Sequence, residues 1–273
     1  MPYLTTADGT ELYYKDWGSG QPVVLSHGWP LNADMWDYQM NFLAANGFRV
    51  IAHDRRGFGR SSQPWTGYDY DTFADDLEQL LAELDISNAL LVGFSMGGGE
   101  VARYLGRHGS KRIAKAVLVS AVTPLMIRRA DHPEGMAPSI FDGIRTGLLN
   151  DRAGFLDAFG PVFTGSDQPG SVVGKPMLEW TQFLALQAGF KGTLDCVAAF
   201  SETDFRPDLR SIDIPTLVIH GDGDAVVSFD VTGKAAAELI RGAQLKVYPG
   251  APHAVYFTHK DQLNQDLLAF ARS

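Results

Sequence analysis

The stretch ALLVGFSMGGG, residues 89–99, carries the strongest structural signal in the sequence. Its first five residues are an apolar run typical of a strand buried on both faces, and the glycines open a segment with helical periodicity. Between them lies the pattern Gly-x-Ser-x-Gly, centred on Ser95. A strand, a tight glycine-flanked turn and a helix form a nucleophile elbow, whose glycines let strand and helix approach closely. We therefore predict that Ser95 is a nucleophile.

Other interpretations of this stretch are weaker. Ser95 could serve only as a helix cap after a glycine-rich turn. A dinucleotide-binding loop would need glycine where Ser95 stands, and a phosphate-binding Walker loop would need a GK[ST] sequence, which does not occur.

Apolar runs and helical periods alternate along much of the chain, which predicts a doubly wound α/β fold with a largely parallel sheet. An early run at 12–16, after a DGT turn, suggests an antiparallel hairpin at one sheet edge. The runs expected to be strands are 23–27, 50–54, 89–93, 115–122, 216–222 and 245–248, and the expected helices are 71–85, 97–108, 228–241 and 260–272.

The alternation stops between residues 123 and 213. This stretch is rich in proline and in phenylalanine and contains no convincing strand. We expect short helices and loops that form a cap, or lid, inserted into one sheet. The core domain would then comprise residues 1–122 and 214–273, and the cap residues 123–213.

The composition argues against several classes of protein. The chain has 273 residues, with 23 Lys and Arg against 32 Asp and Glu, so its net charge of −9 disfavours nucleic acid and anionic membranes as partners. The single cysteine, Cys196, cannot form an intrachain disulfide or a cysteine-rich zinc site. Without a signal-peptide pattern or an apolar run of about 20 residues, a cytoplasmic protein is expected.

A serine nucleophile needs a base, and the order expected after an elbow is serine, acid, histidine. His253 fits, because it follows the predicted strand 245–248 and a Pro-Gly turn. His220 ends a strand and precedes the acid. The acid lies in the sequence HGDGD at 220–224. Asp224 is the preferred candidate because it stands deeper in the loop. Asp222 is the second candidate, but it could instead be a turn residue that bonds its own backbone.

Two backbone N–H groups should stabilise the oxyanion that forms during acyl transfer. One belongs to the residue after the nucleophile, Met96. The other should come from the loop SHGWP, residues 26–30, where Trp29 is the natural donor because Pro30 has no N–H. The arginines in DRRGFGRS, residues 54–61, suggest buried ion pairs near the elbow more than phosphate binding.

With these motifs together, the chain resembles bacterial arylesterases and the cofactor-free haloperoxidases, or perhydrolases, of the α/β-hydrolase superfamily. The likeness runs nearly end to end and implies an eight-stranded, mostly parallel sheet with helices on both faces and a helical cap. It also implies the triad Ser95, Asp224 and His253. The motifs are HGWP at 27–30, DRRGFGRS at 54–61, GFSMGGG at 93–99, SETDF at 201–205 and HGDGD at 220–224.

The resemblance further implies a hydrophobic acyl pocket, although ordinary core packing is an equal alternative for each member. Its expected residues are Phe159 and Phe163 from the cap and Val226, Val227 and Phe229 after the acid. Family members usually have glycine where this chain has Ala254, which would strain the loop of His253 if the position required positive φ. Family members often form trimers or hexamers, which favours a homo-oligomer.

The expected activity is that of a serine esterase for small esters, aryl esters among the candidates, without metal or cofactor. Hydrogen peroxide is expected to intercept the acyl-enzyme and give a peracid, because Pro30 confines Trp29 to extended backbone and can aim its carbonyl at peroxide. A lactonase or amide hydrolase would use the same triad, whereas a dehalogenase or epoxide hydrolase of this fold would carry aspartate at position 95. A non-catalytic binding protein would not need the triad.

Overall fold

The structure is a computed structural model that describes residues 2–273. Its helices pack around one eight-stranded sheet. The strand order is β1-β2-β4-β3-β5-β6-β7-β8, with antiparallel pairs β1–β2 and β2–β4 and parallel pairs elsewhere. The α/β-hydrolase fold and the edge hairpin are thus confirmed. The strands are β1 (Tyr3–Thr5), β2 (Glu11–Gly18), β3 (Gln21–Ser26), β4 (Phe48–His53), β5 (Ala89–Phe94), β6 (Ile113–Val119), β7 (Thr216–Gly221) and β8 (Gln244–Tyr248).

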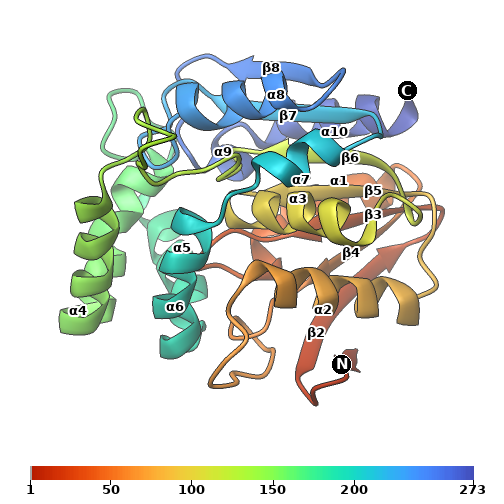
Figure 1. Ribbon diagram of the computed structural model, residues 1–273, viewed down its shortest axis with the longest axis horizontal. Coiled ribbons are helices and arrows are strands. Elements are labelled where there is room, and N and C mark those ends of the chain that lie inside the picture. The colour runs from red at the N-terminus through yellow and green to blue at the C-terminus, as the bar shows by residue number, and fades with distance from the viewer. Residues whose placement is uncertain (1) are drawn as a thin grey trace.

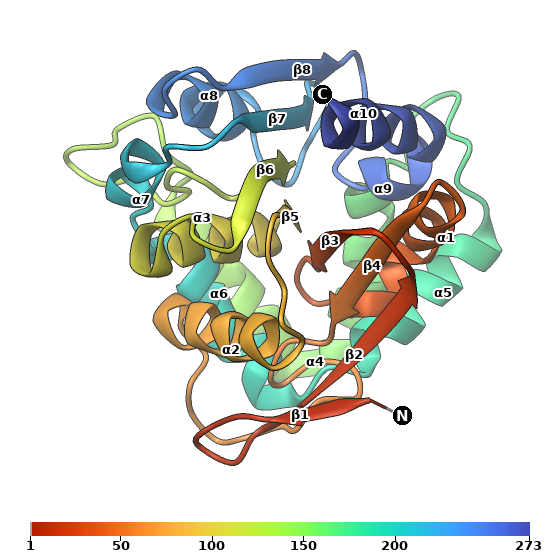
Figure 2. The same cartoon turned by 90° about the vertical axis from the view of Figure 1, so that its right-hand side faces the viewer.

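Helices cover both faces of the sheet (Figure 2). α1 (Asp37–Ala45) and α10 (Lys260–Arg272) lie on one face, whereas α2 (Tyr70–Glu83), α3 (Met96–His108) and α8 (Ala235–Leu239) lie on the other. The central strand β5 is buried along its whole length. This double coverage explains why the central strands read as continuous apolar runs instead of alternating ones.

Local signals set several helix ends. α2 begins after Asp69, whose side chain accepts the N–H of Thr72 over 2.9 Å. α3 ends at Gly109, which adopts φ of 72° and donates its N–H to the carbonyl of Leu105. The predicted helix 228–241 instead contains a π-helical turn, η2 (Asp230–Lys234), followed by α8.

Residues 123–213 hold four helices and, besides isolated bridges, no strand. The absence of strands was expected, but α4 is not short: it spans 27 residues with a kink at Asp151. Three of the helices, α4 to α6, gather at one end of the sheet (Figure 1), while α7 packs against α3 and α8. The helices are α4 (Pro138–Thr164), α5 (Lys175–Leu186), α6 (Phe190–Glu202) and α7 (Arg206–Ser211). Among residues 2–273, no helix has the length and apolar character needed to cross a membrane.

Candidate active site

Ser95 occupies a strained turn between β5 and α3. Its backbone has φ of 54° and ψ of −118°, a region that residues other than glycine rarely adopt. The neighbouring glycines are required by close approach. A Cβ on Gly93 would lie 2.2 Å from the carbonyl oxygen of Gly97, and a Cβ on Gly97 would lie 2.3 Å from that of Ser26. The turn therefore has the geometry that the Gly-x-Ser-x-Gly pattern predicts.

The structure brings Ser95, His253 and Asp224 together. The Oγ–H of Ser95 donates to Nε2 of His253 over 3.0 Å, and Nδ1–H of the same ring donates to Oδ2 of Asp224 over 2.6 Å. This tautomer follows because the carboxylate of Asp224 can only accept. Ser95 retains 6% of its surface exposed, and His253 retains 1%. The three groups form the relay needed to activate a hydroxyl nucleophile.

Asp224 is held in its ionised form. Its Oδ1 accepts the backbone N–H groups of Val226 at 2.9 Å and Val227 at 2.8 Å. Burial opposes ionisation, but the adjacent His253 and His220 hold the pKa of this carboxyl well below its usual range. Asp222, by contrast, is exposed and accepts the backbone N–H of Gly250. The geometry thus favours Asp224 as the acid and gives Asp222 the turn role that was its alternative.

His220 is a neighbour of the acid that the sequence analysis did not assign to the site. Its Nε2 lies 2.9 Å from the carbonyl oxygen of Val227 and 3.2 Å from Oδ2 of Asp224. Because both oxygens are acceptors, Nε2 carries the proton and donates. The first residue of the HGDGD motif thus supports the acid loop.

Two aromatic rings hold the imidazole of His253 in place. The ring of Phe94 lies 4.9 Å from it, and that of Phe163 lies 5.1 Å away at a near-perpendicular angle. The N–H of Ala254 donates to the carbonyl of Phe163, which ties the histidine loop to the cap. Ala254 has φ of −76°, so this position does not require positive φ and the alanine introduces no backbone strain.

The sequence predicts the backbone N–H groups of Trp29 and Met96 as oxyanion donors. Within residues 2–273, neither donates a hydrogen bond to another protein group. Both residues are anchored elsewhere: the indole N–H of Trp29 donates to Thr193 of α6 over 2.9 Å, and the carbonyl of Met96 accepts the hydroxyl of Tyr70 over 3.0 Å. The peptide bond between Trp29 and Pro30 is cis.

A buried charge network lies beneath this loop, as the arginine-rich motif predicts. Nε of Arg55 donates to Glu100 over 2.7 Å, and its Nη2 donates to the carbonyl of His27 over 2.9 Å. Ser26 and His53 also donate to Glu100. Burial opposes ionisation of Glu100, but Arg55 and His53 hold its pKa well below the usual range. The network joins the loop of residues 26–30 to α3 through Glu100, which sequence reasoning missed.

Ser95 and His253 open into an apolar cavity of about 250 Å³. Four of the five predicted pocket residues are on its wall, while Phe229 is not. The ring of Phe229 lies 5.8 Å from that of His220, because the chain turns into η2 directly after it. Besides Ser95 and His253, the whole wall consists of Trp29, Val122, Met126, Met136, Ile140, Phe141, Ile144, Phe155, Phe159, Val162, Phe163, Phe200, Ala225, Val226 and Val227.

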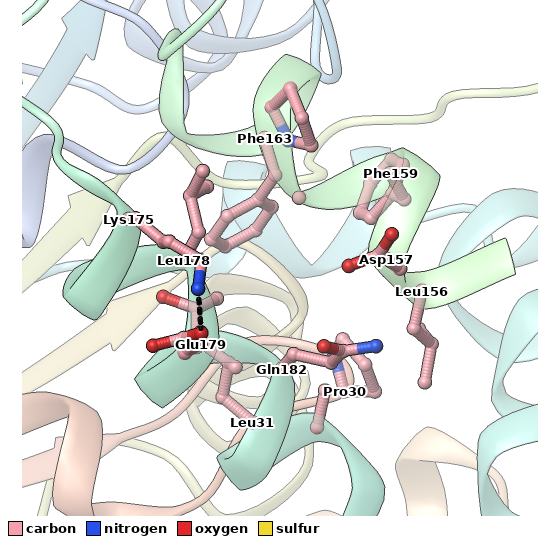
Figure 3. Close-up of a pocket in the computed structure, with 14 residues that line it drawn as sticks. Pro30, Leu31, Leu156, Asp157, Phe159, Phe163, Lys175, Leu178, Glu179 and Gln182 are labelled. Atoms are coloured by element: carbon pink, nitrogen blue, oxygen red, sulfur yellow. Dashed lines mark ion pairs between the residues drawn. The ribbon is translucent and has the colours of Figure 1, made fainter. Parts of the chain in front are cut away.

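Pro30 lines a second cavity of about 370 Å³ between α4 and α5 (Figure 3). Phe159 and Phe163 line both cavities, so their rings form part of the partition between them. Asp157, Glu179 and other polar side chains border the second cavity, and Lys175 pairs with Glu179 at its edge. Among residues 2–273, no cluster of histidine, cysteine or acidic side chains is arranged to hold a metal ion.

Comparisons with known proteins place the chain in a family. Residues 21–260 match the model of the alpha/beta hydrolase fold family. A non-heme chloroperoxidase from Kitasatospora aureofaciens is 47% identical over 272 residues, with 99% of each chain covered, and a bifunctional esterase/perhydrolase from Acinetobacter calcoaceticus is 45% identical over 277 residues, with both chains fully covered. The crystal structure of a bromoperoxidase from Bacillus anthracis superposes with a TM-score of 0.94 and 48% identity, covering 97% of this chain and 96% of the other.

The resemblance to esterases and haloperoxidases, which the sequence motifs indicated, is therefore confirmed over the whole chain by a non-heme chloroperoxidase and an esterase/perhydrolase. With the matched family model, the eight-stranded sheet and the elbow at Ser95, the chain belongs to the α/β-hydrolase family.

Proposed function

We propose that this protein is a serine esterase for small carboxylic esters that also acts as a perhydrolase. The observation that carries the proposal is the continuous relay from Asp224 through His253 to Ser95, which opens into a small apolar cavity. Its similarity to a bifunctional esterase/perhydrolase and to non-heme haloperoxidases supports the same activity.

The geometry supports the following steps of hydrolysis. His253 removes the proton of Ser95 as the oxygen attacks the ester carbonyl, and Asp224 stabilises the imidazolium that forms. The N–H groups of Trp29 and Met96 receive the oxyanion. His253 then protonates the leaving alcohol, and water activated by the same ring releases the acid.

Hydrogen peroxide can replace water in the second half of the reaction. Attack of peroxide on the acyl-enzyme releases a peracid, which oxidises bromide in solution. The Trp29 carbonyl, next to Pro30, is the proposed acceptor for the peroxide hydrogen bond.

The test is hydrolysis of p-nitrophenyl acetate with and without hydrogen peroxide. Ser95→Ala should lower kcat by about 10⁴- to 10⁶-fold, because the relay then has no nucleophile. The exposed Ser228→Ala provides a matched control that should retain activity. Peracid formed by the wild type and absent with Ser95→Ala establishes perhydrolysis. An active Ser95→Ala variant would refute the acyl-enzyme.

A lactone or amide hydrolase is the alternative if the wild type cleaves no ester, and a substrate panel with the same two variants separates these cases. If no substrate distinguishes Ser95→Ala from wild type, a binding role replaces the enzymatic one.

The proposal also includes a cytoplasmic location and a homo-oligomer, a trimer or hexamer. The one cysteine, Cys196, is buried and unpaired, which is compatible with a reducing compartment. Cell fractionation tests the location, and light scattering coupled to size-exclusion chromatography tests the assembly.

A further inference from the structure

Two methionines line the cavity in which the proposed reaction occurs. Met126 and Met136 lie on its wall together with Ser95 and His253. Met126 is 3% exposed and Met136 is partly buried. The N–H of Met136 donates to the carbonyl of Met126 over 2.7 Å, so the first loop of the cap holds the two residues side by side. Two oxidisable thioethers therefore stand in the cavity that contains the nucleophile.

The proposed product is an oxidant for thioethers. A peracid transfers its terminal oxygen to sulfur: the O–O bond breaks and an S–O bond forms. Sulfur loses two electrons and becomes a sulfoxide, while the peracid is reduced to the carboxylic acid, which keeps the proton. Because the cavity is small, a peracid released at Ser95 contacts its wall before it reaches solvent. Proximity of this kind raises the rate of a bimolecular reaction strongly.

We propose that Met126 and Met136 form a self-modification site, where peracid made at Ser95 oxidises the thioethers before it escapes. This inference rests on the perhydrolase activity proposed above. Sulfoxides are polar, so they would disrupt the apolar wall. The enzyme would then lose activity with the number of peracid turnovers, not with time in hydrogen peroxide.

The chain contains its own controls. Met35 and Met40 are fully buried away from the cavity and should stay reduced. Met177 on α5 is partly exposed and does not line the cavity, so it reports oxidant in bulk solution. Tryptic cleavage separates Met126 from Met136, because two arginines lie between them.

In the experiment, the wild type is incubated with ethyl acetate, hydrogen peroxide and excess free methionine. The sulfoxide at each methionine of the chain is then measured by mass spectrometry. Free methionine intercepts peracid in bulk solution, and its own sulfoxide reports how much peracid escapes. We expect Met126 and Met136 to oxidise about tenfold faster than Met177. The excess should vanish without ester and with Ser95→Ala. When peracetic acid is added to the solution without the scavenger, Met177 should be oxidised at least as fast as Met126 and Met136.

The outcomes separate the two proposals. If the scavenger shows peracid above the peroxide background but Met126 and Met136 oxidise no faster than Met177, the self-modification is refuted and the perhydrolase stands. If no peracid forms, both fail.

A second measurement addresses the consequence for activity. The conservative double variant Met126→Leu, Met136→Leu should lose its own initial activity more slowly per turnover than the wild type does. Treatment with methionine sulfoxide reductase should restore the lost activity of the wild type but not that of the double variant. Equal losses per turnover would overturn the link between oxidation and activity.

Discussion

The region beneath Ser95 is built from charged and polar side chains, whereas the region above it is built from apolar ones. Beneath it, Arg55 and Glu100 are 1% exposed or less and join the loop of residues 26–30 to α3 by charged hydrogen bonds. Above it, aromatic and aliphatic side chains from α4 and α6 form the cavity wall. The charged groups below form directional hydrogen bonds, although Nη1 of Arg55 and Nδ1 of His53 have no partner. The apolar contacts above are not directional. The lower region should therefore govern the chemistry and the upper region the choice of substrate.

After the loss of Ser95 itself, the largest expected effect is at the acid. Asp224→Asn should lower kcat by about 10⁴-fold, because an amide cannot stabilise the imidazolium and favours the wrong tautomer of His253. Asp222→Asn, two residues away in the exposed turn, is the control and should change kcat little. The measurement is steady-state hydrolysis of p-nitrophenyl acetate. Similar losses in both variants would remove the distinction between the two aspartates.

The next effect tests the polar region itself. Glu100→Gln leaves Arg55 buried without its counter-charge and should lower the free energy of unfolding by about 3–5 kcal/mol. Glu179→Gln, at the exposed pair with Lys175, should leave that free energy unchanged. Urea unfolding measures both. If Glu100→Gln unfolds like the wild type, the buried network is not a determinant of stability.

The buried pair of Glu100 and Arg55 also makes the free energy of unfolding depend on pH. The pKa of Glu100 is lowered in the folded protein, so its stabilisation is fully present above the unfolded pKa of about 4.3 and is lost as pH falls through the lower folded pKa. The difference in unfolding free energy between wild type and Glu100→Gln should stay level at neutral pH and shrink below about pH 4. A difference that grows toward acid pH would contradict this sign.

A smaller effect is expected in the apolar region. Phe159→Ala removes part of the partition between the two cavities, so longer acyl chains should fit. The ratio of kcat/KM for p-nitrophenyl octanoate to that for the acetate should rise about tenfold. Phe183→Ala, exposed on α5, should leave the ratio unchanged. A general loss of activity without a change in ratio would assign Phe159 to the chemistry. It would contradict the division between a polar region for chemistry and an apolar region for substrate choice.

The smallest expected effect is at Pro30. Pro30→Leu should lower the ratio of perhydrolysis to hydrolysis severalfold, because the Trp29 carbonyl is no longer confined by a following proline. Parallel assays of peracid and of acid release measure the ratio. An unchanged ratio would leave Pro30 without a role in peroxide selection.

The sequence was informative where function and local pattern coincide. Ser95 stands in a motif whose glycines are needed by close backbone approach, and the loop order then led to His253. Glu100 was not recognisable, because a charged residue in a helix is usually exposed and its partner Arg55 comes from a distant turn. Helix α1 was missed for a related reason: Gln39 lies on its buried face and donates to the carbonyl of Tyr256, which hides the apolar period. The direction of Phe229 depends on where η2 begins, which no local pattern indicated.

The backbone at Ser95 sets activity against stability. Its positive φ is destabilising for a residue with a side chain, by about 1–3 kcal/mol, and glycine adopts it without that strain. A Ser95→Gly chain should therefore be more resistant to unfolding than the natural protein while lacking its nucleophile. Selection for thermal resistance alone would favour loss of the enzyme at this position, and only selection for turnover keeps the serine there.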